Sequence, residues 1–138
     1  MHTKNKTLTV YLALLLGVLG VHRLYLKGWR DIGFWLHMLA TGLGLIGLRR
    51  AFVLGQDDQL SWLLMPFFGF SLFAACLAAI VYGLMLEAKW NQAYKGDGST
   101  SGTTIFGVIL SLLLGATALM SAIAFTGQRY FEHAMKNV

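Results

Sequence analysis

The sequence predicts an all-α polytopic membrane protein with four transmembrane helices, and two observations support this prediction. Hydrophobic residues make up 57% of the 138 positions and charged residues only 12%, whereas about 25% of the residues in a soluble domain are charged. The charged residues also lie almost entirely outside four long apolar runs. These runs are continuously apolar rather than alternating, which favours spanning helices over the strands of a barrel.

Each of the four runs is long enough to be considered as a spanning helix, which needs about 20 residues. They cover about residues 8–26, 32–54, 62–86 and 104–125. Lys4 and Lys6 precede the first run as they would in a signal peptide, but no small-x-small cleavage site follows it. Pro66, about one turn into the third run, is expected to kink that helix.

Four spans would place both termini on the same side of the membrane. The lysines and arginines then divide six against five between the two sides, so the positive-inside rule does not decide the orientation.

The chain divides into two parts at about residue 54. Residues 1–54 are predicted to form a two-helix hairpin, and residues 55–138 a second transmembrane helix pair. Between the last two runs, about residues 87–103 end in a Gly/Ser/Thr-rich stretch, which is typical of a flexible, exposed loop.

Small residues recur on one face of each run, where they allow helix backbones to approach closely in lipid. On the third and fourth runs these stripes match, which predicts that the two helices pack on each other or on a second copy of the chain. The predicted packing positions are Gly17, Gly20, Gly33, Gly44, Ala75, Ala79, Gly83, Gly107, Ser111 and Gly115.

His37 is a polar residue within the second run, on the same face as Gly33 and Gly44. A polar side chain inside a membrane is a candidate functional residue. A neutral imidazole can also simply form a hydrogen bond to a neighbouring helix. The sequence leaves open a structural role and a proton- or ligand-linked role.

The stretch GVHRLYLKGWRDIG, residues 20–33, concentrates cations and aromatic rings between the first two runs. Basic groups and amphipathic rings are favoured at the depth of lipid headgroups. The segment is therefore either an anchor for a tight hairpin or a site that binds headgroups or a partner, with Asp31 placed to pair with one cation. The candidate binding residues are His22, Arg23, Tyr25, Lys27, Trp29 and Arg30.

These residues also carry a resemblance to a known family. A glycine pair, a His-Arg pair and a Tyr-Leu pair follow one another as Gly17, Gly20, His22, Arg23, Tyr25 and Leu26. The pattern resembles the TM2 domain, a two-helix hairpin, over about residues 6–54. It departs from the family pattern at Leu24, where an aromatic residue is usual, and at Lys27, where glycine is usual. The resemblance implies a bacterial-type integral membrane protein of a family without established catalytic activity.

Motifs for catalysis or cofactor binding are missing from the sequence. The six carboxylates all lie outside the apolar runs, and the four histidines are not at metal-ligand spacing. The net charge of +5 comes without a dense basic helix, which argues against nucleic-acid binding. We therefore expect no enzyme activity, no cofactor and no metal.

The sequence thus predicts a non-enzymatic binding, scaffold or regulatory component of a bacterial inner membrane, with multiple membrane passes. Its expected partners are membrane lipids and, in addition, either a second copy of itself or another membrane protein. The alternative is a small homo-oligomeric channel or transporter, in which His37 and the small-residue stripes would line a path.

Overall fold

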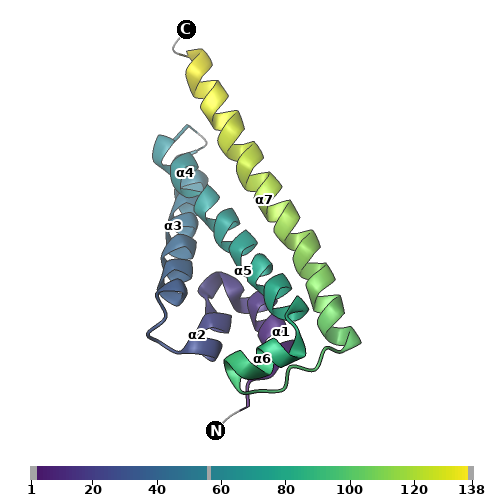
Figure 1. Ribbon diagram of the computed structural model, residues 1–138. Coiled ribbons are helices and arrows are strands. Elements are labelled where there is room, and N and C mark those ends of the chain that lie inside the picture. The colour runs from purple at the N-terminus through teal and green to yellow at the C-terminus, as the bar shows by residue number, and fades with distance from the viewer. Residues whose placement is uncertain (1–2, 56, 137–138) are drawn as a thin grey trace.

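In the computed structural model, which describes residues 3–55 and 57–136, every named element is a helix (Figure 1). Three helical segments are long and apolar enough to cross a membrane. These are α3 (Ile32–Leu54), the consecutive helices α4 (Gln59–Leu64) and α5 (Pro66–Leu84), and α7 (Gly102–Lys136). The shorter elements are α1 (Lys6–Leu16), the 3₁₀ turn η1 (Gly17–Leu19), α2 (Val21–Lys27) and α6 (Glu87–Tyr94). The protein is therefore a helical membrane protein with three candidate spans, and the prediction of four spans is not confirmed.

The first apolar run, about residues 8–26, is broken rather than continuous. Its apolar helical part, Lys6–Leu19, has 14 residues and is about 21 Å long at 1.5 Å per residue, short of the roughly 30 Å hydrocarbon core. The break occurs at Gly20, whose φ of 72° is in the left-handed region that glycine tolerates best. Close packing against Phe34 also leaves little room for a side chain at this position.

After the break the chain turns back toward the side from which it came. The Val18 carbonyl lies at the level of Thr41 and Ser71, well inside α3 and α5. The Tyr25 carbonyl, seven residues later, accepts a hydrogen bond from Lys4, near the start of the chain. In Figure 1, α1 and α2 both lie at the lower end of the molecule, where α3 begins and α5 ends. We call this the N-terminal end of the bundle.

The third run begins with a second, smaller break. Pro66 stands at the first position of α5, directly after Met65, whose backbone is helical, so α4 and α5 follow one another as one span that is interrupted at the proline. Asp58 caps α4 by accepting a hydrogen bond from the Ser61 amide and receives two 2.9 Å hydrogen bonds from Arg50 at the end of α3. The hydrogen bonds with Arg50 hold the pKa of the Asp58 carboxyl below its usual value, so this turn is fixed by an ion pair.

The small-residue stripes lie inside the molecule. Ala75 and Ala79 are fully buried, and Ala79 forms a core with Val10 and Ala13 of α1. A side chain at Gly83 would meet Val108 of α7, and one at Gly115 would meet Cys76 of α5. α5 and α7 pack on each other, as the matched stripes predicted.

The same small residues also enclose α1. A Cβ added at Gly17 would lie 2.5 Å from the Cβ of Ala75, and a Cβ added at Gly107 would lie close to Val10 and Tyr11. Ser111 is fully buried and donates to the Gly107 carbonyl of its own helix. The N-terminal helix is therefore packed against both α5 and α7.

Part of the stretch expected to be a flexible loop, residues 87–103, is helix α6, which covers the N-terminal end of the bundle. Trp90 of α6 is fully buried and donates to the Lys4 carbonyl. Lys6 is also buried, and its ammonium group donates to the Met85 carbonyl at 2.5 Å and to the Thr100 hydroxyl at 2.7 Å. These contacts fasten the first residues of the chain to its second half.

We predict that the two chain termini lie on opposite sides of the membrane, with the N-terminal end in the cytoplasm. Three spans place seven basic residues at the N-terminal end and four at the other, and the positive-inside rule assigns the richer side to the cytoplasm. The seven, in or next to α1, α2 and α6, are Lys4, Lys6, Arg23, Lys27, Arg30, Lys89 and Lys95, and the four, at the ends of α3 and α7, are Arg49, Arg50, Arg129 and Lys136. Reporter fusions before Met1 and after Val138 should report opposite compartments, and matching signals would rule out the three-span topology.

A second prediction concerns the α3–α5 contact. Gly44→Ala should destabilise the protein, because a Cβ there would lie against the backbone of Phe68, whereas the Cβ of Gly42→Ala would meet nothing within 4 Å. Gly42→Ala should be neutral or slightly stabilising, since alanine is the better helix former by about 1 kcal/mol. Thermal unfolding of both variants in the same detergent checks this, and equal melting temperatures would contradict the close contact.

Candidate functional site

The motif at residues 20–33 folds into α2, a short turn and the beginning of α3. Asp31 caps α3 by accepting a hydrogen bond from the Phe34 amide at 3.1 Å. Its carboxylate also receives Arg23 Nη1 at 3.2 Å and lies 3.9 Å from Lys27 Nζ. Two cations thus share one carboxylate, so an excess of positive charge remains at this point.

The aromatic side chains of the motif have two different environments. The Tyr25 hydroxyl accepts a hydrogen bond from the Asn5 amide, and Lys4 Nζ lies 4.5 Å from the centre of the ring. Trp29 is 68% exposed and its carbonyl accepts a hydrogen bond from the Trp35 indole. Tyr25 therefore anchors the N-terminal segment, while Trp29 and its exposed neighbour Arg30 form the outer surface of the motif.

His22 lies inside the protein rather than on this surface. Its side chain is fully buried, with its ring edge-to-face against His37 at 5.4 Å and near Tyr82 at 6.2 Å. Neither ring nitrogen has a hydrogen-bond partner among residues 3–55 and 57–136. The motif thus contributes Lys27 and Arg30 to its outer face and His22 to the interior, with the half-buried Arg23 between them.

A group of polar side chains surrounds the break in the first run. His37 Nδ1 lies 3.2 Å from the Ser71 hydroxyl, which lies 3.0 Å from the Thr41 hydroxyl. Thr41 donates to the Val18 carbonyl at 2.5 Å, and Ser71 approaches the same oxygen at 3.4 Å. We call His22, His37, Thr41 and Ser71 the polar centre.

The polar centre has a clear structural task. A helix that stops inside a membrane leaves carbonyl groups without partners, and water is not there to satisfy them. The hydroxyls of Thr41 and Ser71 satisfy the Val18 carbonyl. This role was not predicted from the sequence, although two hydroxyl residues within apolar runs were a signal for it.

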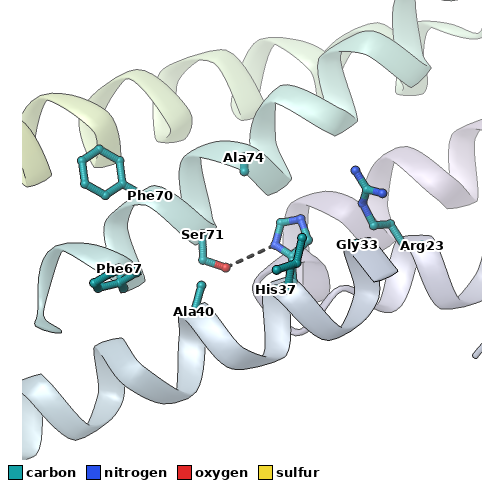
Figure 2. Close-up of a pocket in the computed structure, with 9 residues that line it drawn as sticks. Arg23, Gly33, His37, Ala40, Phe67, Phe70, Ser71 and Ala74 are labelled. Carbon is teal, nitrogen blue, oxygen red and sulfur yellow. Dashed lines mark hydrogen bonds between the residues drawn. The ribbon is translucent and has the colours of Figure 1, made fainter. Parts of the chain in front are cut away.

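Beside the polar centre, α3 and α5 enclose an open groove with a cavity of about 280 Å³. Figure 2 shows Arg23 at one end of this α3–α5 groove, with His37 and Ser71 deeper between the helices. Its remaining lining is apolar or small: Gly33, Leu36, Ala40, Phe67, Phe70 and Ala74. A side chain at Gly33 would collide with the guanidinium of Arg23, so glycine is what allows Arg23 to lie across the start of α3.

This arrangement suits a ligand that is anionic at one end and apolar along its length. Binding sites of this kind combine apolar walls with a few polar groups that fix orientation, and a guanidinium is the preferred partner of phosphate or carboxylate groups. In the part of the chain that the structure describes, no three potential metal ligands gather in one place.

Comparison with known proteins finds a family model that matches the first part of the chain. Residues 2–52 match the family model of the TM2 domain, in agreement with the resemblance seen in the motif. No curated protein and no solved structure matches the chain.

We predict that Thr41→Val combined with Ser71→Ala destabilises the fold, because the buried Val18 carbonyl then loses both hydroxyl donors. An unsatisfied buried acceptor costs about 1–3 kcal/mol. Thr117→Val is the matched control, since the exposed Thr117 only donates to the Leu113 carbonyl within its own helix. Thermal unfolding should show a clear loss for the double variant and little change for the control. A double variant as stable as the control would show that the break needs no hydroxyl.

Proposed function

We propose that this TM2-domain membrane protein is a non-enzymatic binding component of a bacterial inner membrane that engages anionic membrane lipids at the N-terminal end of its bundle. The observation that carries the proposal is the pairing of two cations, Arg23 and Lys27, with a single carboxylate, Asp31, next to the exposed side chains of Trp29 and Arg30. Cations and tryptophan are together the side chains that favour the headgroup layer.

The position of the motif supports this proposal. The turn lies at the beginning of α3, where a spanning helix leaves the hydrocarbon core, so its basic groups reach the level of the lipid phosphates. Each basic residue near an anionic membrane surface contributes about 1 kcal/mol. The cytoplasmic orientation predicted from the charge asymmetry would place the motif at the leaflet whose surface is negatively charged.

A scaffold or regulatory role would use the same surface with an anionic partner protein in place of lipid. Lys27 and Arg30 remain accessible for such a contact, while the neighbouring His22 and Tyr25 serve the fold. Isolation of the protein from native membranes, with identification of both lipids and proteins, separates the two forms of the proposal.

One observation favours a second function, a small homo-oligomeric channel or transporter. The polar centre places two histidines and two hydroxyls at the depth of the spanning helices, and ionisable groups at that depth often mark ion or proton pathways. Ion flux into liposomes containing the purified protein tests this function. Flux that is abolished by His37→Gln would favour the channel over the binding component.

We predict that Lys27→Gln combined with Arg30→Gln weakens the enrichment of anionic lipid around the protein. Two exposed cations worth about 1 kcal/mol each set an upper limit of about 30-fold. The measurement is the ratio of phosphatidylglycerol to phosphatidylcholine that co-purifies from vesicles of mixed composition.

The matched control is Lys89→Gln combined with Lys95→Gln, which removes the same charge from the same end of the bundle without touching the motif. We expect a smaller loss from the control. Equal losses would show that overall charge, rather than the motif, attracts the lipid.

A further inference from the structure

We propose that the α3–α5 groove is a binding site for one anionic phospholipid, whose phosphate lies on Arg23 and whose acyl chain lies between α3 and α5. This inference rests on the proposed function and makes it specific, since it assigns a single lipid to a defined site in addition to the general attraction of the exposed cations.

Arg23 has hydrogen-bond donors that its contacts within the chain do not use. A guanidinium has five N–H donors, and the contact with Asp31 uses Nη1. Nε is buried and has no partner among the residues that the structure describes. Because Lys27 shares the same carboxylate, an anion placed on Arg23 would meet net positive charge. Phosphate oxygens match the planar donor geometry of arginine.

The groove points from the membrane surface inward. It starts at Arg23 and Gly33, at the N-terminal end of the bundle, and continues along α3 to Ala40 (Figure 2). Seven residues of helix correspond to about 10 Å, so the groove runs from the membrane surface toward the middle of one leaflet. An acyl chain attached to a headgroup at Arg23 follows the same path.

The walls of the groove are apolar and shaped by small residues. Ala40 and Ala74 leave the space, and Phe67 and Phe70 form its far end. A lipid chain gains no hydrophobic energy when it moves from bulk lipid to such walls, because both environments are apolar. The walls therefore supply shape and orientation, and the preference for an anionic lipid comes from Arg23.

His37 gives the groove a second polar contact, about one helical turn deeper than Gly33. Because the Ser71 hydroxyl donates to the Val18 carbonyl, His37 Nδ1 donates to Ser71, and Nε2 of the neutral ring is an acceptor. The preference for an anionic headgroup therefore depends on Arg23, with His37 as part of the groove lining.

The test uses the full chain in nanodiscs of dioleoyl phosphatidylcholine that contain a small fraction of dioleoyl phosphatidylglycerol. Native mass spectrometry counts the lipids retained on the released protein. We expect one retained phosphatidylglycerol per chain, with at least a tenfold preference over phosphatidylcholine. Ala74→Phe, which fills the groove, should remove this lipid. Ala116→Phe, an equal change at an exposed position of α7, should not.

The phosphate contact is tested by Arg23→Gln, which should reduce the preference at least tenfold, and by Arg23→Lys, which keeps the charge and should retain part of it. Thermal unfolding shows which variants are folded. If Arg23→Gln does not fold, the comparison of Ala74→Phe with Ala116→Phe remains decisive. Retention of the lipid by a folded Ala74→Phe variant would overturn the proposal.

Two further arms distinguish a phospholipid in the groove from a free anion and from lipid attracted only by the exposed cations. Inorganic phosphate should not stabilise the wild-type protein as phosphatidylglycerol does, and equal stabilisation would overturn the lipid assignment in favour of a free anion. The Arg30→Gln variant, which leaves Arg23, Lys27 and Asp31 intact, should keep the single retained lipid even though it loses part of the surrounding enrichment. If this variant loses enrichment but keeps the single lipid, the groove binds its lipid separately from the exposed cations. If the enrichment is unchanged and the single lipid is kept, only the proposal that the exposed cations attract lipid is contradicted.

Discussion

The fold depends on satisfying the backbone of a helix that ends inside the membrane. At residues 17–20 the first helix tightens into η1 and then stops at the left-handed Gly20. Lipid offers no partner for the carbonyl groups that such an ending leaves, so the Val18 carbonyl relies on the hydroxyls of Thr41 and Ser71. This requirement places α1 inside the bundle, and the small residues of α5 and α7 make room for it. The packing in the second half of the chain is therefore also the enclosure that the first half needs.

The sequence predicted the three long spans well because their physical signals are local. The second run coincides with α3, and each of the two aspartates, Asp31 and Asp58, caps the helix that follows it. The first run is not confirmed as a span, and hydropathy could not reveal its break because hydropathy records how apolar a segment is and says nothing about its backbone conformation. The residues of this run are apolar enough for a span, but the glycine at position 20 lets the chain reverse direction. That reversal is stable only because hydroxyls on two other helices are in reach, and no local pattern contains this information.

The candidate site shows the same division between local and distant information. The sequence identified the residues of the motif as a group, but it could not separate His22 from Arg23, which are neighbours in sequence and lie in different surroundings. His22 packs on His37 in the interior, while Arg23 reaches Asp31 and the end of the groove. The groove itself depends on the register between α3 and α5, which sets Ala40 and Ala74 in the same wall as Phe67 and Phe70. A pattern within one helix cannot predict that register, so the groove appears only in the structure.

The break in the first helix also determines which basic residues lie at the N-terminal end of the bundle. A continuous first span would carry Arg23, Lys27 and Arg30 to the side opposite the N-terminus and leave the two sides with nearly equal numbers of basic residues. Because α2 returns, these three cations join Lys4 and Lys6 at the N-terminal end of the bundle. An asymmetry of seven against four then follows from a single turn of the backbone, and with it a preferred orientation under the positive-inside rule. The same turn brings Arg23 across Gly33 to the end of the α3–α5 groove. One conformational event therefore brings the cations together at one end of the bundle and completes the groove.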